Sequence, residues 1–475
     1  MSTSYRSPFS WRYGRPEMRA LFSEQTKRRM WRRLWLALAQ AQSGAGLVNA
    51  EELADLRRHV DDIDIEAAHK IEAEISHDLM AELRVYASQA RVGGGKLHLG
   101  ATSMDIEDNV DIARMKVALS MLAGSLSEIL TTFAEKIEQH ADEVCMAYTH
   151  LQAAEPTTLG LRLALWAQDF LLAHEDLKRV AAWLPAKGLR GAVGTSASYD
   201  MLLRDTAQTS DGLEREVMDA FGLRALPVSG QTYARSVDYR VLASLAGFAS
   251  AAAKFALDVR VLASSPFGEL GEPFGRQQVG SSAMPFKRNP ILCERIDSLA
   301  RLLPANAQIA WQNAADNMLE RTLDDSANRR SVIPESFLAA DEIGALVHKV
   351  IAGLRVDHRR IALNVERFGP FAATEPVLMA AGKRGADRQK LHERLRDLSM
   401  EAWSAMEEGR PNPLADLLAR DDAVGASLGV EELAELMDPR RHTGLAAERA
   451  RRFAASLKDF VGSAPPAAIM DIPLR

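Results

Sequence analysis

Three stretches of this 475-residue chain gather side chains that could carry out chemistry. They are His77–Asp78 with Lys96–Ser103, then Thr149–Gln152 ahead of Glu155–Thr158, and finally Gly280–Pro290 with Arg321–Arg330. Their hydroxyls, amides, lysines and arginines donate hydrogen bonds, and carboxylates are their only groups that solely accept. Such donors stabilise developing negative charge, which favours a site that handles polyanions over hydride or redox chemistry.

Each stretch is also open to a structural interpretation. Threonine and serine are common helix caps, and a histidine such as His150 can be a hydrogen-bonded core residue. In the last stretch, Asp324 and Asp325 are potential ion-pair partners of Arg329 and Arg330. Residue types alone therefore leave catalysis and packing both open.

The sequence offers little for other kinds of site. It contains no GxxxxGK[ST] and no HExxH motif, and its eleven histidines lack metal-binding spacing. Gly93–Lys96 and Gly188–Gly194 are rich in glycine, but neither follows a convincing strand, so both are weak candidates for phosphate binding. We expect no metal centre.

Composition argues against several classes of protein. The 58 basic and 64 acidic residues give a net charge of −6, whereas a dedicated nucleic-acid binder carries a basic excess. The uncharged stretch between Arg240 and Lys254 is shorter than the roughly 20 residues of a membrane span, and the first residues lack an apolar signal region. Two cysteines, Cys145 and Cys293, cannot build a disulfide framework. We expect a cytoplasmic protein with no nucleic-acid or membrane partner.

Long helices are expected to position the polar stretches. No proline occurs between Pro16 and Pro156, and apolar residues spaced three or four apart predict a helix of about 38 residues from Thr102 or Ser103. Alternating β-branched runs are nearly absent, so the sequence predicts an all-α fold around a bundle. Further helices are expected at 24–43, 157–182, 236–264, 290–319 and 334–355.

We expect three domains, namely an N-terminal helical domain at 1–103, a central long-helix bundle at 104–356 and a C-terminal helical domain at 357–475. Within the bundle, Ser265–Gly280 has four glycines and two prolines and resists helix formation, which suits an active-site lid in a loop spanning 265–290. The basic residues Lys27–Arg29, Arg32 and Arg33 are expected on a solvated helix face, opposite a buried Trp/Leu stripe.

The third polar stretch resembles a known signature. Gly280–Pro290 reads GSSAMPFKRNP and is similar to the signature loop of the fumarase/aspartase/argininosuccinate lyase superfamily. Other segments resemble the adenylosuccinate lyase family within it, especially its animal-type branch. These segments are Ser4–Met18, His98–Ser103, Gly230–Arg235 and Glu320–Arg330.

The resemblance implies a β-elimination that releases fumarate. The implied substrates are adenylosuccinate, which gives AMP, and the succinylated aminoimidazole carboxamide ribotide SAICAR, which gives AICAR. It also implies a homotetramer with a core of twenty long helices, active sites shared between subunits, and no metal or organic cofactor.

The resemblance further assigns roles to residues. Ser281 would be the base that removes the Cβ proton of the succinyl group, and His150, expected on a rigid helix, would protonate the departing nitrogen. Lys287 would hold a carboxylate and stabilise its developing charge. The implied substrate-binding residues are Arg12, Tyr13, His77, Asp78, Thr102, Ser103, Gln231, Asn289, Arg295, Arg321, Ser326 and Arg330.

The chain departs from the family pattern at two positions. Ser76 stands where the family usually has arginine, so a cation would have to come from elsewhere, with Lys96 as a candidate. Phe286 replaces the usual histidine or tyrosine of the loop. Neither change removes a group with an implied catalytic role, so we expect activity.

Two alternatives stay open. Thr149–Gln152 also resembles other lyases of the superfamily, such as argininosuccinate lyase, but a nucleotide phosphate calls for the additional arginines and hydroxyls found in 320–330. The other alternative is a catalytically silent helical scaffold, against which the presence of Ser281, His150 and Lys287 argues.

Overall fold

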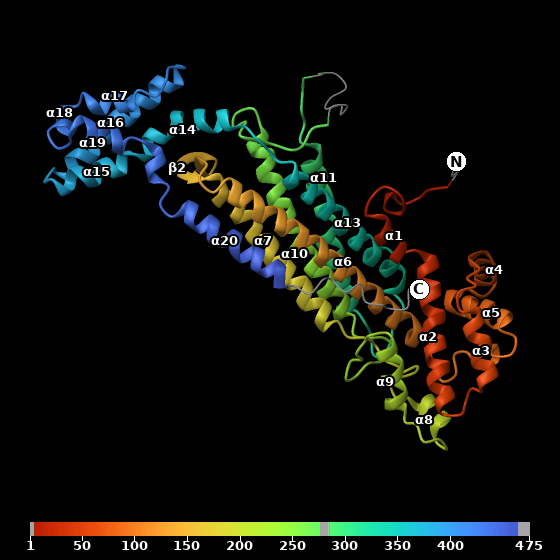
Figure 1. The fold of residues 1–475 in the computed structure, drawn as a ribbon. Helices are drawn as coiled ribbons and strands as arrows, with labels where there is room; N and C mark the ends of the chain where they lie inside the picture. Colours follow the sequence, from red (N-terminus) through yellow and green to blue (C-terminus); the bar gives the residue numbers. More distant parts are fainter. Residues whose placement is uncertain (1–3, 276–283, 285, 464–475) are drawn as a thin grey trace.

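The computed structural model describes residues 4–275, 284 and 286–463, and Ser281 lies outside these residues. Figure 1 shows an elongated molecule with long helices in the middle and a smaller group of helices at each end. The predicted all-α fold is confirmed, because strands are confined to two short pairs within the part described.

The N-terminal residues form a group of short helices around one longer helix. Its elements are η1 Pro8–Ser10, α1 Pro16–Leu21, α2 Glu24–Gly44, α3 Ala50–His59, α4 Ile65–Ile75, α5 Asp78–Gln89 and η2 Gly94–Lys96. The basic cluster on α2 was expected in solvent, and this prediction is wrong. Arg28 and Arg32 are buried and both bind the buried carboxylate of Glu82, because ion pairing offsets the cost of removing these charges from water.

The middle of the molecule is built on α6, which spans the 37 residues Ser103–Gln139 and is therefore about 55 Å long. The carboxylate of Asp105 accepts the backbone N–H of Thr102 and so closes the first turn. The other bundle helices are α7 Leu159–Trp183, α10 Ser236–Ala263, α11 Ile291–Ala300, α12 Leu302–Ala315 and α13 Ser326–Ala352. Two short helices, α8 Ala197–Leu203 and α9 Ser210–Ala220, lie at the lower end in Figure 1.

Two expected helices have different bounds. The helix expected at 290–319 is divided at Arg301, and Pro304, which has no N–H to donate, lies in the first turn of α12 where none is needed. The helix expected from residue 334 starts eight residues earlier, since α13 continues through Pro334 and buries Val332 and Ile333 before it.

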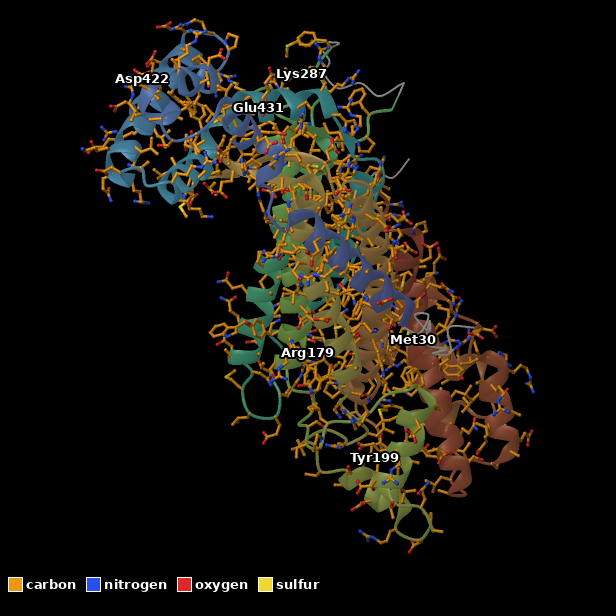
Figure 2. The ribbon with its side chains drawn as sticks, turned by 60° about the vertical axis from the view of Figure 1, so that its left-hand side comes forward. Met30, Arg179, Tyr199, Lys287, Asp422 and Glu431 are labelled. Carbon is orange, nitrogen blue, oxygen red and sulfur yellow. The ribbon has the colours of Figure 1, made fainter. Side chains whose placement is uncertain are left out.

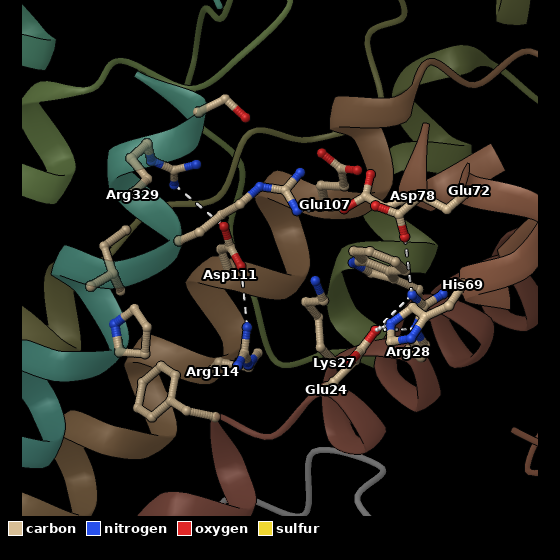
Figure 3. Close-up of a pocket in the computed structure, with 16 residues that line it drawn as sticks. Glu24, Lys27, Arg28, His69, Glu72, Asp78, Glu107, Asp111, Arg114 and Arg329 are labelled. Atoms are coloured by element: carbon tan, nitrogen blue, oxygen red, sulfur yellow. Dashed lines mark hydrogen bonds and ion pairs between the residues drawn. The ribbon is translucent and has the colours of Figure 1, made fainter. Parts of the chain in front are cut away.

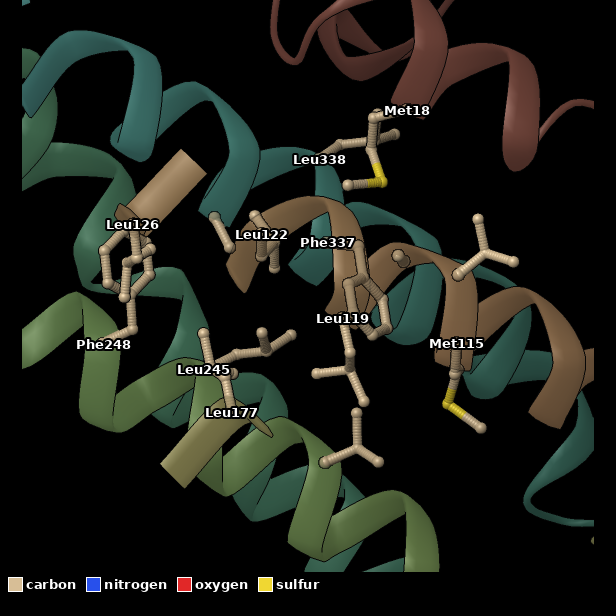
Figure 4. Packing of buried hydrophobic residues seen from close by; sticks show 14 of the residues in the cluster. Met18, Met115, Leu119, Leu122, Leu126, Leu177, Leu245, Phe248, Phe337 and Leu338 are labelled. Atoms are coloured by element: carbon tan, nitrogen blue, oxygen red, sulfur yellow. The ribbon is translucent and has the colours of Figure 1, made fainter. Parts of the chain in front are cut away.

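The bundle interior is filled by side chains from α6, α7, α10 and α13, as Figure 4 shows. Leu122 and Leu126 of α6, Leu245 of α10 and Phe337 of α13 have no exposed surface. Each large apolar side chain buried in this way contributes about 1.5–3 kcal/mol. By length and composition α6 and α10 are apolar enough to cross a membrane, yet both help to build this core.

The C-terminal residues form a second core. It is contributed by α15 Thr374–Lys383, α16 Arg388–Glu407, α17 Leu414–Ala419, α18 Asp422–Gly425 and α19 Val430–Leu436, and Phe371 of α14 His358–Ala372 packs against it. The short η3 Pro439–His442 follows α19 and has no buried residue. The last helix, α20 Ala446–Ser463, returns to pack along α6 and α7. The division into three domains, with boundaries after residues 103 and 356, stays a prediction.

The strands lie at the upper end of the bundle in Figure 1. β1 (Val144–Thr149) pairs with β2 (Gln152–Thr158) in an antiparallel hairpin. β3 (Leu270–Gly271) pairs with β4 (Arg355–Val356). The sequence suggested that the segment 265–280 has no regular structure. This is not wholly correct, because two of its residues, Leu270 and Gly271, belong to a sheet.

Candidate active site

Three helices begin close together at the lower end of the bundle. Ser103 is the first residue of α6, and its hydroxyl lies 3.3 Å from Nε2 of His77, which caps α5. Asp78, the first residue of α5, forms a 2.9 Å ion pair with Arg330 near the start of α13. Helix N-termini carry partial positive charge and unpaired N–H groups, so their convergence favours an anionic ligand.

Arg321 and Gln231 are held beside these helix starts. Arg321 donates to Asp325 at 3.1 Å, and the backbone N–H of Gln231 donates to the carbonyl of Glu320 at 3.1 Å. We call the predicted site residues at this end the basal cluster. Its members are His77, Asp78, Thr102, Ser103, Gln231, Arg321, Ser326 and Arg330.

A buried ionic network supports the basal cluster, and sequence reasoning missed it. The guanidinium of Arg235 lies 3.0 Å from Asp108 of α6 and 2.6 Å from Asp325, which also binds Arg321. Asp108, Arg235 and Asp325 are all almost fully buried. A sequence signal for this network was available, because Asp108 is a charged residue in a predicted helix that carries regularly spaced apolar residues. The alternative in which Asp325 pairs with Arg329 or Arg330 is wrong, since those arginines bind Asp238 and Asp78.

A cavity of about 370 Å³ adjoins the basal cluster, which contributes Asp78, Ser326 and Arg330 to its wall (Figure 3). Burial, together with the nearby Asp78 and Asp111, raises the pKa of Glu107 to about 8. Burial likewise lowers the pKa of Lys27. The other lining residues are Phe22, Glu24, Arg28, Trp31, His69, Glu72, Arg114, Arg329, Ile333 and Pro334.

Three predicted binding residues, Arg12, Tyr13 and Arg295, lie farther along the bundle. The backbone N–H of Gly14, next to Tyr13, donates to Glu342 at 3.1 Å. Arg295 of α11 approaches the same carboxylate at 4.0 Å. Glu342 thus links the N-terminal segment to α11 through α13.

His150 lies in the turn of the β1–β2 hairpin, so its expected place on a helix is wrong. Thr149 pairs with Gln152, and the two residues between them, His150 and Leu151, have φ values of 55° and 62°. Positive φ at both central residues is the geometry of a type I′ turn, and residues other than glycine disfavour it. Strain of this kind, about 1–3 kcal/mol per residue, is often kept at functional sites.

The hairpin is anchored by one buried carboxylate. Glu269 accepts hydrogen bonds from the hydroxyl of Tyr148 at 2.8 Å, from Arg162 at 3.1 Å and from the amide of Asn364 at 2.8 Å. These contacts tie β1 to α7, α14 and the segment that precedes β3. His150 itself is exposed, as a group that meets a ligand must be.

Lys287 is also exposed and lies at the hairpin end of the molecule, together with Asn289. Figure 2 shows Lys287 and Tyr199 at opposite ends, and the Tyr199 hydroxyl binds Asp105 of the basal cluster's α6 at 3.2 Å. The structure therefore assembles the basal cluster but keeps His150, Lys287 and Asn289 away from it within one chain.

Lys96 does not replace the arginine expected at position 76. Its ammonium group donates to the carbonyl of Leu47 at 3.0 Å and lies 3.9 Å from Glu52. The cations that line the adjoining cavity come instead from α2, α6 and α13, as Figure 3 shows.

Similarity to known proteins defines the class of this protein. Residues 13–302 match the family described as Lyase. The crystal structures of 3-carboxy-cis,cis-muconate lactonizing enzyme from Pseudomonas putida and of fumarate lyase from Mesorhizobium sp. BNC1 share its fold. Their TM-scores are 0.83 and 0.81, each at 23% identity, and they cover 95% and 97% of this chain and 99% and 100% of theirs.

Residues 370–453 match a second family, described as Adenylosuccinate lyase C-terminus. The adenylosuccinate lyase of Saccharomyces cerevisiae is 37% identical over 95% of this chain and 94% of its own. That of Schistosoma mansoni is 37% identical over 94% of each chain, and that of Archaeoglobus fulgidus is 34% identical over 94% of this chain and 97% of its own. The chain belongs to the adenylosuccinate lyase family.

Proposed function

We propose that this protein eliminates fumarate from adenylosuccinate, leaving AMP, and from SAICAR, leaving AICAR, in the cytoplasm and without a cofactor. The observation that carries this proposal is the similarity to adenylosuccinate lyases along nearly the whole chain, including the C-terminal family. The basal cluster supports it, because arginines, hydroxyls and helix N-termini suit a nucleotide phosphate.

In the proposed reaction, Ser281 removes a proton from Cβ of the succinyl group while the C–N bond breaks. His150, as imidazolium, gives a proton to the departing nitrogen, so that it does not leave as an anion. Proton donation of this kind is worth typically 10²–10⁴-fold in rate. Lys287 and Asn289 hold the carboxylate on which negative charge accumulates, and their donors stabilise it.

The proposed site needs more than one chain. His150 and the basal cluster lie at opposite ends of a helix about 55 Å long, a distance that no single substrate of this class spans. In a symmetric oligomer with antiparallel neighbours, the hairpin end of one subunit can meet the basal cluster of another. We propose the homotetramer implied by the sequence resemblance.

Exposed apolar side chains on the bundle support this assembly. Leu165 and Leu172 of α7 are 63% and 56% exposed and lie seven residues apart, on one face. Leu257 of α10 and Trp311 of α12 are also more than half exposed. Soluble monomers rarely leave large apolar patches in water.

One assay tests the function directly. The purified protein is incubated separately with adenylosuccinate, argininosuccinate and malate, and fumarate is measured. We expect fumarate from adenylosuccinate alone. Turnover of argininosuccinate in its place would favour the alternative lyase, and no turnover of any substrate would favour a silent scaffold.

A further inference from the structure

Lys27 differs from the other cations of the cavity in Figure 3 because it forms no ion pair within the described part of the chain. Among the residues described, no carboxylate lies within 4.0 Å of its ammonium group, which rests 4.8 Å from the centre of the Trp31 ring. Each arginine of the cavity wall has an acidic partner. These pairs are Arg28 with Glu24, Arg114 with Asp111, Arg329 with Asp238 and Arg330 with Asp78.

The charge of Lys27 is compensated only in part. The carboxylates that act on it from a distance, Asp78 and Asp111, are each already paired with arginines. The side chain is partly buried between α2 and the starts of α5 and α6, and Glu107, which also lines the cavity, is largely protonated near neutral pH. A cation removed from water without a counter-ion is costly, and an anionic ligand would offset that cost. The indole N–H of Trp31, 2% exposed, likewise has no acceptor in the part of the chain described.

The cavity also contains features that suit a phosphate. Ser326 opens α13, whose N-terminus carries partial positive charge, and Arg330 lies one turn further on. Both are members of the basal cluster. The succinyl carboxylates have other proposed partners, Lys287 and Asn289, at the hairpin end, which leaves the phosphate as the anion for this end.

We propose that Lys27 binds the phosphate of the nucleotide, together with Ser326 and Arg330. This inference rests on the proposed function and adds a residue to its substrate site. Lys27 then supplies, from α2, the positive charge that Ser76 cannot carry, while Lys96 donates to the carbonyl of Leu47 instead. Lysine acts here as a point charge that is not tied to another protein group.

The test compares AMP with adenosine, which lacks the phosphate, by isothermal titration calorimetry on the full-length protein. For Lys27→Met we expect about 10–100-fold weaker AMP binding, the usual cost of losing a hydrogen bond to a charged group. Adenosine affinity should not change, and this also reports that the site is folded. Lys27→Arg should keep most of the AMP affinity.

Arg29→Met is the matched control, because it removes one positive charge from the same helix. Arg29 does not line the cavity and forms an ion pair with Asp61 at 3.4 Å. This variant should bind both ligands like the wild type. Unchanged AMP affinity in Lys27→Met, an equal loss for adenosine, or an equal loss in Arg29→Met would overturn the inference.

Fumarate release from adenylosuccinate by the wild type is measured in parallel, so that the two proposals can fail separately. If the wild type releases fumarate and Lys27→Met keeps its AMP affinity, the inference is wrong and the function stands. If the wild type releases none but Lys27→Met loses AMP affinity selectively, the function is wrong and the phosphate site stands.

Discussion

Ser103 and His150 lie at opposite ends of α6. Ser103 is the first residue of this helix, and His150 lies in the β1–β2 hairpin that follows its last residue. A helix of 37 residues is stiff and holds its own two ends about 55 Å apart. If both contact one substrate, they come from different subunits. Catalysis then depends on assembly, because no rearrangement of a hairpin bridges that distance.

Replacing His150 with glutamine should lower kcat by about 10²–10⁴-fold, the usual contribution of a general acid. The exposed turn position predicts that folding and oligomeric state are unaffected. Steady-state kinetics and light scattering measure the two properties. Turnover close to that of the wild type would remove His150 from its proposed role.

Mixing two inactive variants should restore activity if the ends of different subunits meet. His150→Gln damages the hairpin end and Arg330→Gln the basal cluster. After the two proteins are mixed, dissociated and reassociated at random, about a quarter of the sites combine two undamaged ends. Recovered fumarate release measures this fraction. A mixture as inactive as its components would indicate that each site is built within one chain.

A charge on the exposed face of α7 should disrupt the oligomer. Leu165→Glu places a carboxylate where we expect an apolar contact, and burying an unpaired charge costs several kcal/mol. Size-exclusion chromatography with light scattering should show smaller species, with activity lost in parallel. Met400→Glu on α16, also an exposed apolar position, is the control and should stay assembled. An intact, active Leu165→Glu oligomer would place the interface elsewhere.

Much of the architecture could be predicted because helical periodicity is a local property. The spacing of apolar residues gave α6 and α10 almost to the residue. The spacing did not predict the hairpin that contains His150, because its two turn residues, His150 and Leu151, are not the usual glycine or asparagine. Glu269, which anchors that hairpin, lies more than a hundred residues away in sequence from its partner Tyr148.

The burial of charged residues could not be predicted for the same reason, since it depends on partners that lie far away in the sequence. Arg28 and Arg32 look like residues of a solvated face, because their partner Glu82 lies about 50 residues further along the chain. Likewise, Arg235 contacts Asp108 and Asp325 only once α6, α10 and α13 have packed. Sequence patterns report on neighbours along a helix, whereas burial of a charge depends on tertiary contacts.

Arg235 should be essential for stability. Arg235→Met leaves the buried carboxylates of Asp108 and Asp325 without this cation, which costs about 3–5 kcal/mol for a broken buried pair. Urea unfolding should show a correspondingly lower midpoint. Arg179→Met removes an exposed arginine that pairs with Asp176 and should stay within about 0.5 kcal/mol of the wild type. Equal midpoints for the two variants would contradict the importance of the network.

Glu107 should make the folded state less stable as the pH rises. Its pKa is raised from 4.5 to about 8, so between these values the folded protein retains a proton that the unfolded chain has lost. The native state then binds more protons, and the free energy of unfolding falls with pH by at most about 1.4 kcal/mol per unit. Glu107→Gln cannot ionise, so relative to the wild type its melting temperature should improve progressively from pH 5 to pH 8.5. Below about pH 3.5 the difference should become constant, because Glu107 is then largely protonated in both states. Parallel pH profiles for the two proteins across pH 5–8.5 would show that Glu107 ionises in the folded state as it does in the unfolded chain.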